Sequence, residues 1–391
     1  MPEKTAEKQK QTRPQQTRPL RSYLRFRSRK GWRNHFPPHD DYGFFGPGSV
    51  SWKVWGHPTS YVLGFARSVT IEHLDPNLAA AVVQSGGVKY RPHTRYGRTM
   101  HYFSLMAFGA TYPTAKAADV LVKVHSKAIG NDPVTGDTYD ANRPSSQLWI
   151  HMTAWHSILY CYEKFGPGAL SSQEEEQYWA ECARSAELQT IDPRTVPRSR
   201  AAVREYLENW RPHLAASEAA QDMVDFILPL DVALPPNLSR AGRIAVAPVV
   251  WMLSKGVAAT YPKYIRKMFG VRQGPVMDAL AVVLNKGYHA LLYRSFTMKF
   301  FMMNLLAPGA MQVAAPAILG IPAKNPVTMT PREAQQKYGF AEPADAHPDF
   351  RARQHERVFG KGEKPSDEGL NESQQHFGAL NAGDVRRDAA A

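Results

Sequence analysis

Apolar residues recur every three to four positions along most of the chain from about residue 59 to residue 303. Few windows show the alternation that is typical of a half-buried strand. Cap residues divide the pattern into helix-sized segments, among them Ser49, Thr114 and Ser171. The sequence therefore predicts an all-α fold. With 391 residues, of which 43% are hydrophobic, we expect a single multi-helix bundle with a sizeable core.

The two ends of the chain differ in composition from this body. Residues 1–33 hold eleven Lys and Arg side chains against two Glu, and so carry most of the net charge of +13. This composition predicts a disordered basic arm over residues 1–33. From Lys324 the chain is polar, with scattered Pro and Gly. We expect a largely disordered polar tail over 324–391, with a short helix at 331–338, and a helical catalytic domain over 34–323.

The cysteines and the apolar stretches limit the class of protein. Two cysteines, Cys161 and Cys182, cannot build a disulfide framework or a four-cysteine zinc site. The basic N-terminus leads into Gln, Pro and Arg, so it lacks the pattern of a secretory signal. Apolar stretches such as 245–253 are too short to span a bilayer, which takes about 20 residues. We expect a cytoplasmic protein without a nucleic-acid partner, whose basic arm can contact a membrane surface.

Two expected helices, 115–129 and 146–165, each carry a histidine among apolar residues. On the first, apolar residues at helical spacing turn His125 inward, and its small neighbours leave room for a flat ring. On the second, His151 shares a face with Trp155 and is a core or pocket-lining residue. A lone histidine on an apolar face is more often a core residue than a ligand, so both interpretations stay open.

A basic motif precedes these histidines. Arg95 and Arg98 lie three positions apart, on one face of a helical turn, and Thr99 follows. Alone, such a pair is usually a solvated basic face. Together with His125 and His151, it matches what a buried iron porphyrin needs, namely one nitrogen ligand in a dry pocket and cations for propionates or bound oxygen. The sequence contains no HExxH, no phosphate-binding glycine loop and no Gly-x-Ser-x-Gly.

Several segments, in order, resemble the family of latex-clearing rubber oxygenases and MpaB-type oxygenases. The resemblance covers about residues 43 to 295. It implies an all-helical fold, haem b held through one histidine, and dioxygen as co-substrate; rubber-cleaving members split the double bonds of polyisoprene. The segments that carry it are Gly46-Pro47-Gly48-Ser49-Val50, Trp52, Gly56-His57-Pro58, Arg95 to Thr99, Val124-His125, Leu148 to His151, Tyr162 to Gly166, Tyr178 with Glu181, and Tyr261-Pro262 with Ile265-Arg266.

Residue by residue, the resemblance makes His125 the proximal iron ligand and Arg95 an arginine beside the haem, while Thr99 matches the threonine that ends the motif. Arg98 stands where rubber-cleaving members can carry a lysine that ligates the distal side. Guanidinium stays charged and is a poor iron ligand, so this is a departure. The family's catalytic carboxylate has no match at the right spacing, although Glu72 lies near in sequence.

The resemblance thus implies a haem b-dependent oxygenase with catalytic Arg98 and Thr99. His125 would bind the metal, and His125, Arg95 and His151 would bind the cofactor. The substrate would be an apolar molecule, isoprenoid or lipid-like, oxidised with dioxygen. The alternative is a non-catalytic helical module that binds haem or a lipid without turnover.

Overall fold

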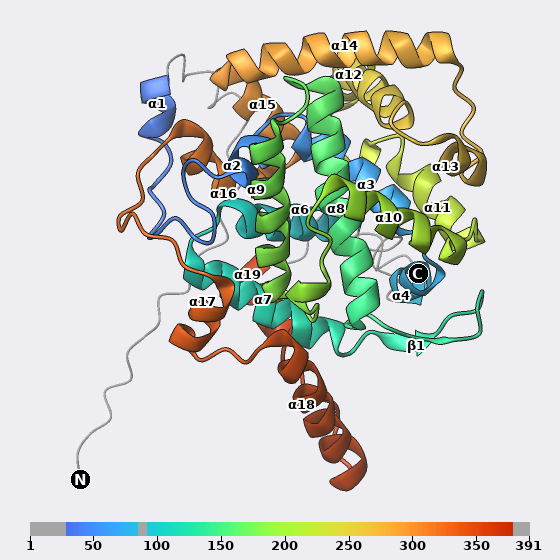
Figure 1. The fold of residues 1–391 in the computed structure, drawn as a ribbon, viewed down its shortest axis with the longest axis vertical. Coiled ribbons are helices and arrows are strands. Elements are labelled where there is room, and N and C mark those ends of the chain that lie inside the picture. Colours follow the sequence, from blue (N-terminus) through green and yellow to red (C-terminus); the bar gives the residue numbers. More distant parts are fainter. Residues whose placement is uncertain (1–28, 85–91, 378–391) are drawn as a thin grey trace.

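The computed structural model describes residues 29–84 and 92–377, and within them it confirms the all-α fold (Figure 1). One small antiparallel sheet of two strands interrupts the helices, where β1 pairs with β2. The elements of the first half are α1 (Arg29–Arg33), α2 (Val50–Trp55), the π-helical turn η2 (Ser60–Gly64), α3 (Phe65–Glu72), α4 (Pro76–Gln84), α6 (Pro92–Phe108), α7 (Thr111–His125), β1 (Ile129–Asn131), β2 (Thr138–Asp140), α8 (Pro144–Phe165) and α9 (Ser172–Ser185).

The second half is helical throughout its described residues, apart from connecting loops. Its longer helices are α10 (Arg200–Trp210), α11 (Glu218–Ile227), α12 (Arg240–Ala258), α13 (Lys263–Met268), α14 (Pro275–Arg294), α15 (Phe296–Leu306), α16 (Pro308–Leu319), α17 (Pro331–Tyr338), α18 (Pro343–His355) and α19 (Leu370–Phe377). Short turns of helix are η3 (Ala186–Leu188), η4 (Pro193–Thr195), η5 (Arg211–His213), η6 (Asp231–Ala233) and η7 (Glu356–Gly360).

The helix α8 runs through the middle of the molecule and is buried on nearly all sides (Figure 1). One of its faces, with Met152 and Trp155, belongs to a core shared with α2, α6, α9 and α16. Another face, with Trp149 and Phe165, belongs to a second core shared with η2, α3, α11 and α12. A helix that is apolar all round is expected at such a position, because every face meets another helix. α8 therefore joins the two cores.

The start of α7 differs from the expected one. Thr114 was expected as the cap, but the helix begins at Thr111, and the Thr114 hydroxyl donates to the carbonyl of Ala110 at 2.9 Å. The reason is a contact distant in sequence: the Thr111 amide donates to Asp41 Oδ1 at 2.7 Å. A carboxylate at a helix N-terminus satisfies a free amide and suits the helix dipole. By contrast, the expected caps Ser49 and Ser171 are confirmed.

The basic arm was expected to reach residue 33, and for its last residues this was wrong. Residues 1–28 lie outside the described residues, whereas residues 29–33 form α1. The Trp32 side chain is 0% exposed, and its ring lies 5.0 Å from that of Phe300 on α15, centroid to centroid. Burial of so large an aromatic ring outweighs the local basic composition. The helical body therefore begins by residue 29.

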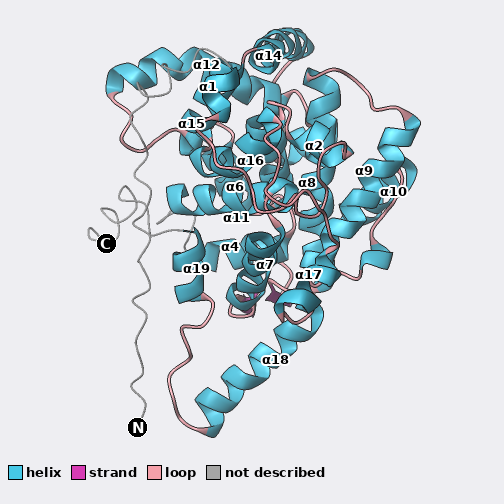
Figure 2. Ribbon diagram, turned by 90° about the vertical axis from the view of Figure 1, so that its left-hand side faces the viewer, coloured by secondary structure: helices cyan, strands magenta, loops and turns pink. Residues whose placement is uncertain are grey.

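The segment from Lys324 also differs from the tail expected from its composition. The helix at 331–338 is confirmed as α17, with a capping box of Thr330 and Glu333. Two further helices, α18 and α19, follow and contact α7, and α18 projects from the body (Figure 2). Glu372 on α19 lies 2.9 Å from Lys116 Nζ and 3.4 Å from Lys123 Nζ. Ion pairs with α7 and the burial of single apolar side chains such as Phe350, 1% exposed, hold this segment. Residues 378–391 lie outside the described part.

Among the described helices, α12 alone has the length and composition that crossing a membrane requires. Its 18-residue window has a mean hydropathy of 1.2, and 28% of it is buried inside the protein. One such helix is weak evidence of a span, because core helices of soluble proteins meet the same criterion. The helix extends beyond the apolar stretch 245–253 that seemed too short from the sequence.

The burial of Trp32 gives a test of the N-terminal boundary. We expect Trp32→Ala to lower the free energy of unfolding by about 3–5 kcal/mol, because it removes a fully buried ring and leaves a cavity. Urea unfolding monitored by circular dichroism measures this change. The exposed neighbour on the same helix provides the control, and Lys30→Ala should stay within about 0.5 kcal/mol of wild type. Equal stability of the two variants would contradict the packing of α1.

Candidate functional site

A buried arginine connects two helix ends that are distant in sequence. The Arg95 guanidinium of α6 interacts electrostatically with Glu72 and His73, at the end of α3, and with His125, the last residue of α7. Burial lowers the pKa of Arg95, and the charge of Glu72 opposes that shift. A charged group taken out of water acts strongly on its neighbours, because the surrounding dielectric constant is low. Arg95 is therefore the electrostatic centre of the candidate site.

Glu72 is the carboxyl group of this site, and the sequence did not assign it. Burial raises its pKa from the ordinary 4.5 to about 8, while Arg95 and a hydrogen bond from Ser68 act in the opposite direction. The carboxyl Oε1 lies 3.8 Å from His73 Nδ1, and the backbone carbonyl accepts a hydrogen bond from Trp149 Nε1 at 3.0 Å. Glu72 is thus mostly uncharged near neutral pH. In the sequence, the one indication of this role was its position as an acidic residue at the end of an apolar helix.

His125 is present as a neutral imidazole. Burial, with help from the charge of Arg95, lowers its pKa from 6.5 to about 4, while Asp140 opposes the shift. Its Nδ1 lies 3.3 Å from Gln147 Nε2, one turn into α8. The same Gln147 amide contacts the carbonyl of Ala141, which holds it in place. A neutral imidazole with one nitrogen in contact with a fixed side chain has the form that metal-binding histidines take.

His73 is a second buried histidine at this site, and the sequence did not single it out. Its Nδ1 lies 2.5 Å from the carbonyl of Val69, one turn earlier on α3. Its Nε2 is buried without a hydrogen-bond partner in the described part of the chain. Burial lowers its pKa to about 4, the hydrogen bond to Val69 opposes the shift, and Arg95 adds to it. His73 is therefore the first alternative to His125 as a nitrogen ligand.

The other predicted site residues lie at different distances from this centre. Thr99, one turn after Arg95, donates to the Arg95 carbonyl at 2.8 Å. Arg98 points towards α19, where its Nη1 lies 3.4 Å from Ser373 Oγ. His151 has both ring nitrogens in contact with other groups: Nε2 lies 2.9 Å from the Cys182 carbonyl and Nδ1 lies 3.0 Å from Gln189 Nε2. The structure thus brings Arg95 and His125 together with Glu72, whereas Thr99 contacts the backbone of Arg95, and the roles of all five predicted site residues stay predictions.

The residues around Arg95 fit a porphyrin in kind. Among residues 29–84 and 92–377, no group of three His, Cys, Asp or Glu side chains could hold a metal ion on its own. A haem needs only one protein ligand, and His125 offers a neutral nitrogen beside a buried cation. For Nε2 to bind iron, Nδ1 must carry the proton, and Gln147 must then present its amide oxygen. Such a flip would also turn the amide oxygen toward the Ala141 carbonyl, so the Gln147 side chain would have to give up its contact with Ala141.

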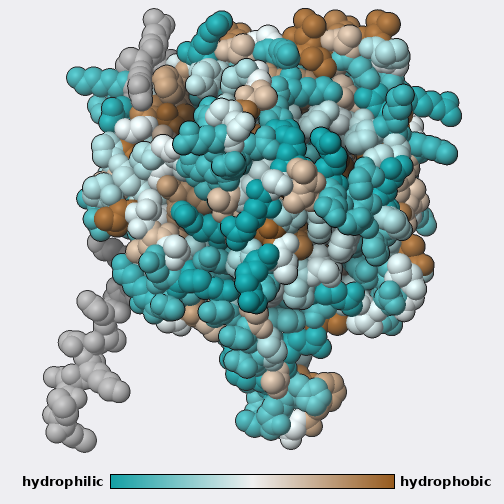
Figure 3. Space-filling view, viewed as in Figure 1, coloured by the Kyte–Doolittle hydropathy of each residue, from teal (hydrophilic) through white to brown (hydrophobic). Residues whose placement is uncertain are grey.

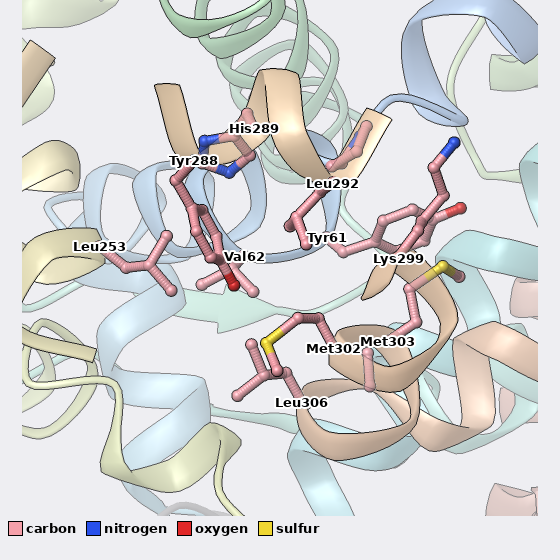
Figure 4. Close-up of a pocket in the computed structure, with 12 residues that line it drawn as sticks. Tyr61, Val62, Leu253, Tyr288, His289, Leu292, Lys299, Met302, Met303 and Leu306 are labelled. Carbon is pink, nitrogen blue, oxygen red and sulfur yellow. The ribbon is translucent and has the colours of Figure 1, made fainter. Parts of the chain in front are cut away.

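A separate apolar cavity lies between η2, α12, α14 and α15 (Figure 4). The space open to the centre of a water molecule is about 20 Å³, so it is narrow. Two tyrosines that line it, Tyr61 and Tyr288, have buried hydroxyls without a hydrogen-bond partner in the described part. Burial lowers the pKa of Lys299 to about 8, and its Nζ lies 5.0 Å from the centroid of the Tyr293 ring.

One hydrogen bond connects the cavity to the Arg95 site. Tyr96, which follows Arg95 on α6, donates from its hydroxyl to the carbonyl of Leu306 at 2.6 Å, and Leu306 lines the cavity. Phe65 packs on Tyr96 at 6.1 Å and on Phe103 at 5.8 Å, centroid to centroid. Aromatic and aliphatic side chains therefore fill the space between the cavity and the Arg95 site, and the Arg95 site has apolar neighbours on that side.

Comparison with known families identifies the largest part of the chain. The family model described as ER-bound oxygenase mpaB/B'/Rubber oxygenase, catalytic domain, matches residues 52–291. No curated protein and no solved structure matches the chain significantly. The matched region begins within α2 and ends within α14, and so includes Glu72, Arg95, Thr99 and His125.

The raised pKa of Glu72 gives a test of the site. Between the ordinary 4.5 and about 8, the folded protein holds a proton that the unfolded chain has lost. Stability should therefore fall as pH rises through this range, at up to about 1.4 kcal/mol per pH unit, and level off above pH 8. His73 and His125, whose pKa values are lowered by burial, contribute to the pH dependence of stability only below about pH 6.5.

The measurement is urea unfolding at several pH values from 6.5 to 8. In Glu72→Gln a neutral amide replaces the neutral acid. The fall in the free energy of unfolding with rising pH that we attribute to the Glu72 proton should therefore disappear. The exposed carboxylate on α10 gives the control, and Glu205→Gln should keep the wild-type slope. An unchanged slope in Glu72→Gln would show that Glu72 does not hold the proton.

Proposed function

The chain belongs to the family of ER-bound mpaB/B' oxygenases and rubber oxygenases, and we propose that it is a haem b-dependent oxygenase acting on an apolar, isoprenoid or lipid-like substrate with dioxygen. The match covers the catalytic domain of that family, so the chain contains an oxygenase catalytic domain. The observation that carries the proposal is the neutral imidazole of His125 beside the buried guanidinium of Arg95 and the uncharged carboxyl of Glu72.

His125 and Arg95 would hold the cofactor. His125 Nε2 would bind the iron, with Gln147 fixing the ring through Nδ1. The Arg95 guanidinium would form an ion pair with a haem propionate. The negative charge of the propionate would then help to balance the positive charge of Arg95. When bound, haem supplies the activation of dioxygen, which the side chains of the protein cannot provide.

Glu72 would move the proton. With a pKa of about 8, it is mostly protonated at neutral pH, yet close enough to its pKa to exchange a proton with a bound molecule. A group whose pKa lies near the working pH is the most effective general acid or base. Arg95 would stabilise the carboxylate that forms when the proton leaves.

Thr99 and Arg98 would assist at the same site. The Thr99 hydroxyl donates to the Arg95 carbonyl, and this hydrogen bond fixes the turn of α6. The hydroxyl oxygen can still accept a hydrogen bond from a bound molecule. Arg98 is a permanent cation that donates hydrogen bonds without replacing a ligand on iron. We propose that it stabilises negative charge developing on oxygen. The aromatic rings of Phe65 and Tyr96 beside the site support an apolar substrate.

The ligand assignment is tested by haem binding. We expect His125→Ala, reconstituted with haem, to lose its Soret band while its far-ultraviolet circular dichroism keeps the helical spectrum, because the only assigned nitrogen ligand is gone. Added imidazole should restore the band, since it can occupy the vacated space. The exposed His355 gives the control, and His355→Ala should bind haem like wild type. Full haem content in His125→Ala and loss in His73→Ala would move the ligand to His73.

Turnover separates an enzyme from a binding module. With an isoprenoid polyene as substrate, we expect Glu72→Gln to keep its Soret band and to lower kcat for dioxygen uptake by about 10²-fold or more, because a general base contributes about that much. Oxygen-electrode rates normalised to haem content measure this. Haem binding without any oxygen uptake by wild type would support the alternative of a non-catalytic haem- or lipid-binding module.

A further inference from the structure

The polar and apolar faces of α14 are reversed relative to a surface helix. Its buried residues include Asn285 and His289, each at most 1% exposed. Its solvent face carries Val276, 82% exposed, and Val283, 67% exposed. Leu280 and Leu291 continue this face at helical spacing. A helix of a water-soluble protein shows the opposite arrangement, with its apolar stripe turned inward. The outward face of α14 therefore favours a medium other than water.

The neighbouring helix α12 extends this apolar surface. It packs against α14 so closely that a Cβ on Gly256 would meet Asn285 Nδ2 at 2.6 Å. Its exposed side carries Ile244 and Trp251, which are 67% and 46% exposed. The two helices lie together at one edge of the molecule (Figure 1), and apolar side chains gather over that edge (Figure 3). The α12–α14 face is defined here by its exposed Ile244, Trp251, Val276, Leu280, Val283 and Leu291.

Cationic side chains surround the α12–α14 face. Residues 240–294 contain nine Lys and Arg and a single carboxylate, Asp278, which lies 2.7 Å from Arg266. Cations border the apolar residues directly: Arg243 and Lys255 line one hollow with Ile244 and Trp251, where Asp225 and Asp231 of the preceding segment also lie. Lys263 lines another hollow with Val283. Six of the nine are exposed, namely Arg240, Lys263, Lys267, Arg272, Lys286 and Arg294.

We propose that the α12–α14 face docks on an anionic lipid surface, with its apolar residues entering the acyl boundary and the cations meeting the headgroups. Apolar residues on one side of a helix, flanked by Lys and Arg, are typical of helices lying in a membrane interface. Each basic residue near an anionic leaflet adds to the attraction. A second copy of the chain would fit less well, because a symmetric contact would place these like charges against each other.

The inward faces of the two helices explain why the face lies on the membrane rather than across it. Asn285 Nδ2 donates to the carbonyls of Met252 and Ala281, at 2.9 and 2.8 Å, and His289 Nδ1 lies 2.8 Å from the Asn285 carbonyl. These polar groups need their protein partners. A pair of helices fixed to the body on one side can offer only the other side to lipid, so docking immerses the α12–α14 face alone.

Vesicle flotation of the full-length protein tests the docking without reference to haem or turnover. We expect binding to vesicles of phosphatidylcholine and phosphatidylserine at 7:3, and at least tenfold weaker binding to pure phosphatidylcholine. The double variant Val276→Asp with Val283→Asp should lower the bound fraction on the mixed vesicles at least tenfold, and Lys286→Glu should lower it several-fold. Phe359→Asp is the matched control, since Phe359 is 77% exposed on η7, beyond α18 at the opposite end of the molecule.

Three outcomes would overturn the proposal. The first is no binding to the mixed vesicles, or equal binding by the Asp double variant. The second is loss of binding when Lys4, Lys8, Lys10 and Arg13 are changed to Gln in the full chain while the double variant still binds, which would assign the contact to the basic arm. The third is a wild-type dimer that becomes a monomer in the double variant without any vesicle binding, measured by light scattering.

Discussion

The burial of α8 on all sides is the constraint on which the rest of the structure depends. Because this helix has hardly any solvent face, other helices must surround it, and they do so as two cores to which α8 contributes residues on different faces. The same helix supports the candidate site. Gln147 contacts the ring of His125, and Trp149 donates to the carbonyl of Glu72. The packing of the bundle and the geometry of the site are therefore set by the same residues.

The electrostatics of the site follow from burial around one charge. Burial lowers the pKa of His73 and His125 and keeps them neutral, and the positive charge of Arg95 acts in the same direction. Burial raises the pKa of Glu72 more than Arg95 lowers it, so the acid stays protonated near neutral pH. A cation, a neutral imidazole and a neutral acid in one place form a set that can hold a cofactor and exchange a proton. In water the acid would be ionised at neutral pH, so its protonated state depends on this setting.

The α12–α14 face is linked to the Arg95 site through the cavity that α14 lines. The cavity that α14 lines with Tyr288 and His289 lies between this face and α15, whose Leu306 accepts a hydrogen bond from Tyr96 beside Arg95. The polar groups of Asn285 and His289 on α14 thus point into the protein, while Val276, Leu280, Val283 and Leu291 point out. The outward aliphatic groups would be more stable against a lipid surface than in water, because removing apolar surface from water is favourable. The apolar substrate that we propose would dissolve in such a surface, close to the docked protein.

The sequence alone determined what depends on neighbours in the chain. Helical periodicity gave the all-α class, the Ser49 and Ser171 caps followed from local spacing, and the basic motif led to Arg95 and His125 through the family resemblance. Contacts between distant segments decided the rest. Glu72 joined the site because α3 and α6 meet in space, which no spacing in the chain reveals. The packing of α18 and α19 on the body rests on contacts with α7, among them the ion pair of Lys116 with Glu372 on α19, and these exist only once α7 is in place. A chain pattern records which side of a helix is apolar, but only tertiary packing decides which side faces the protein.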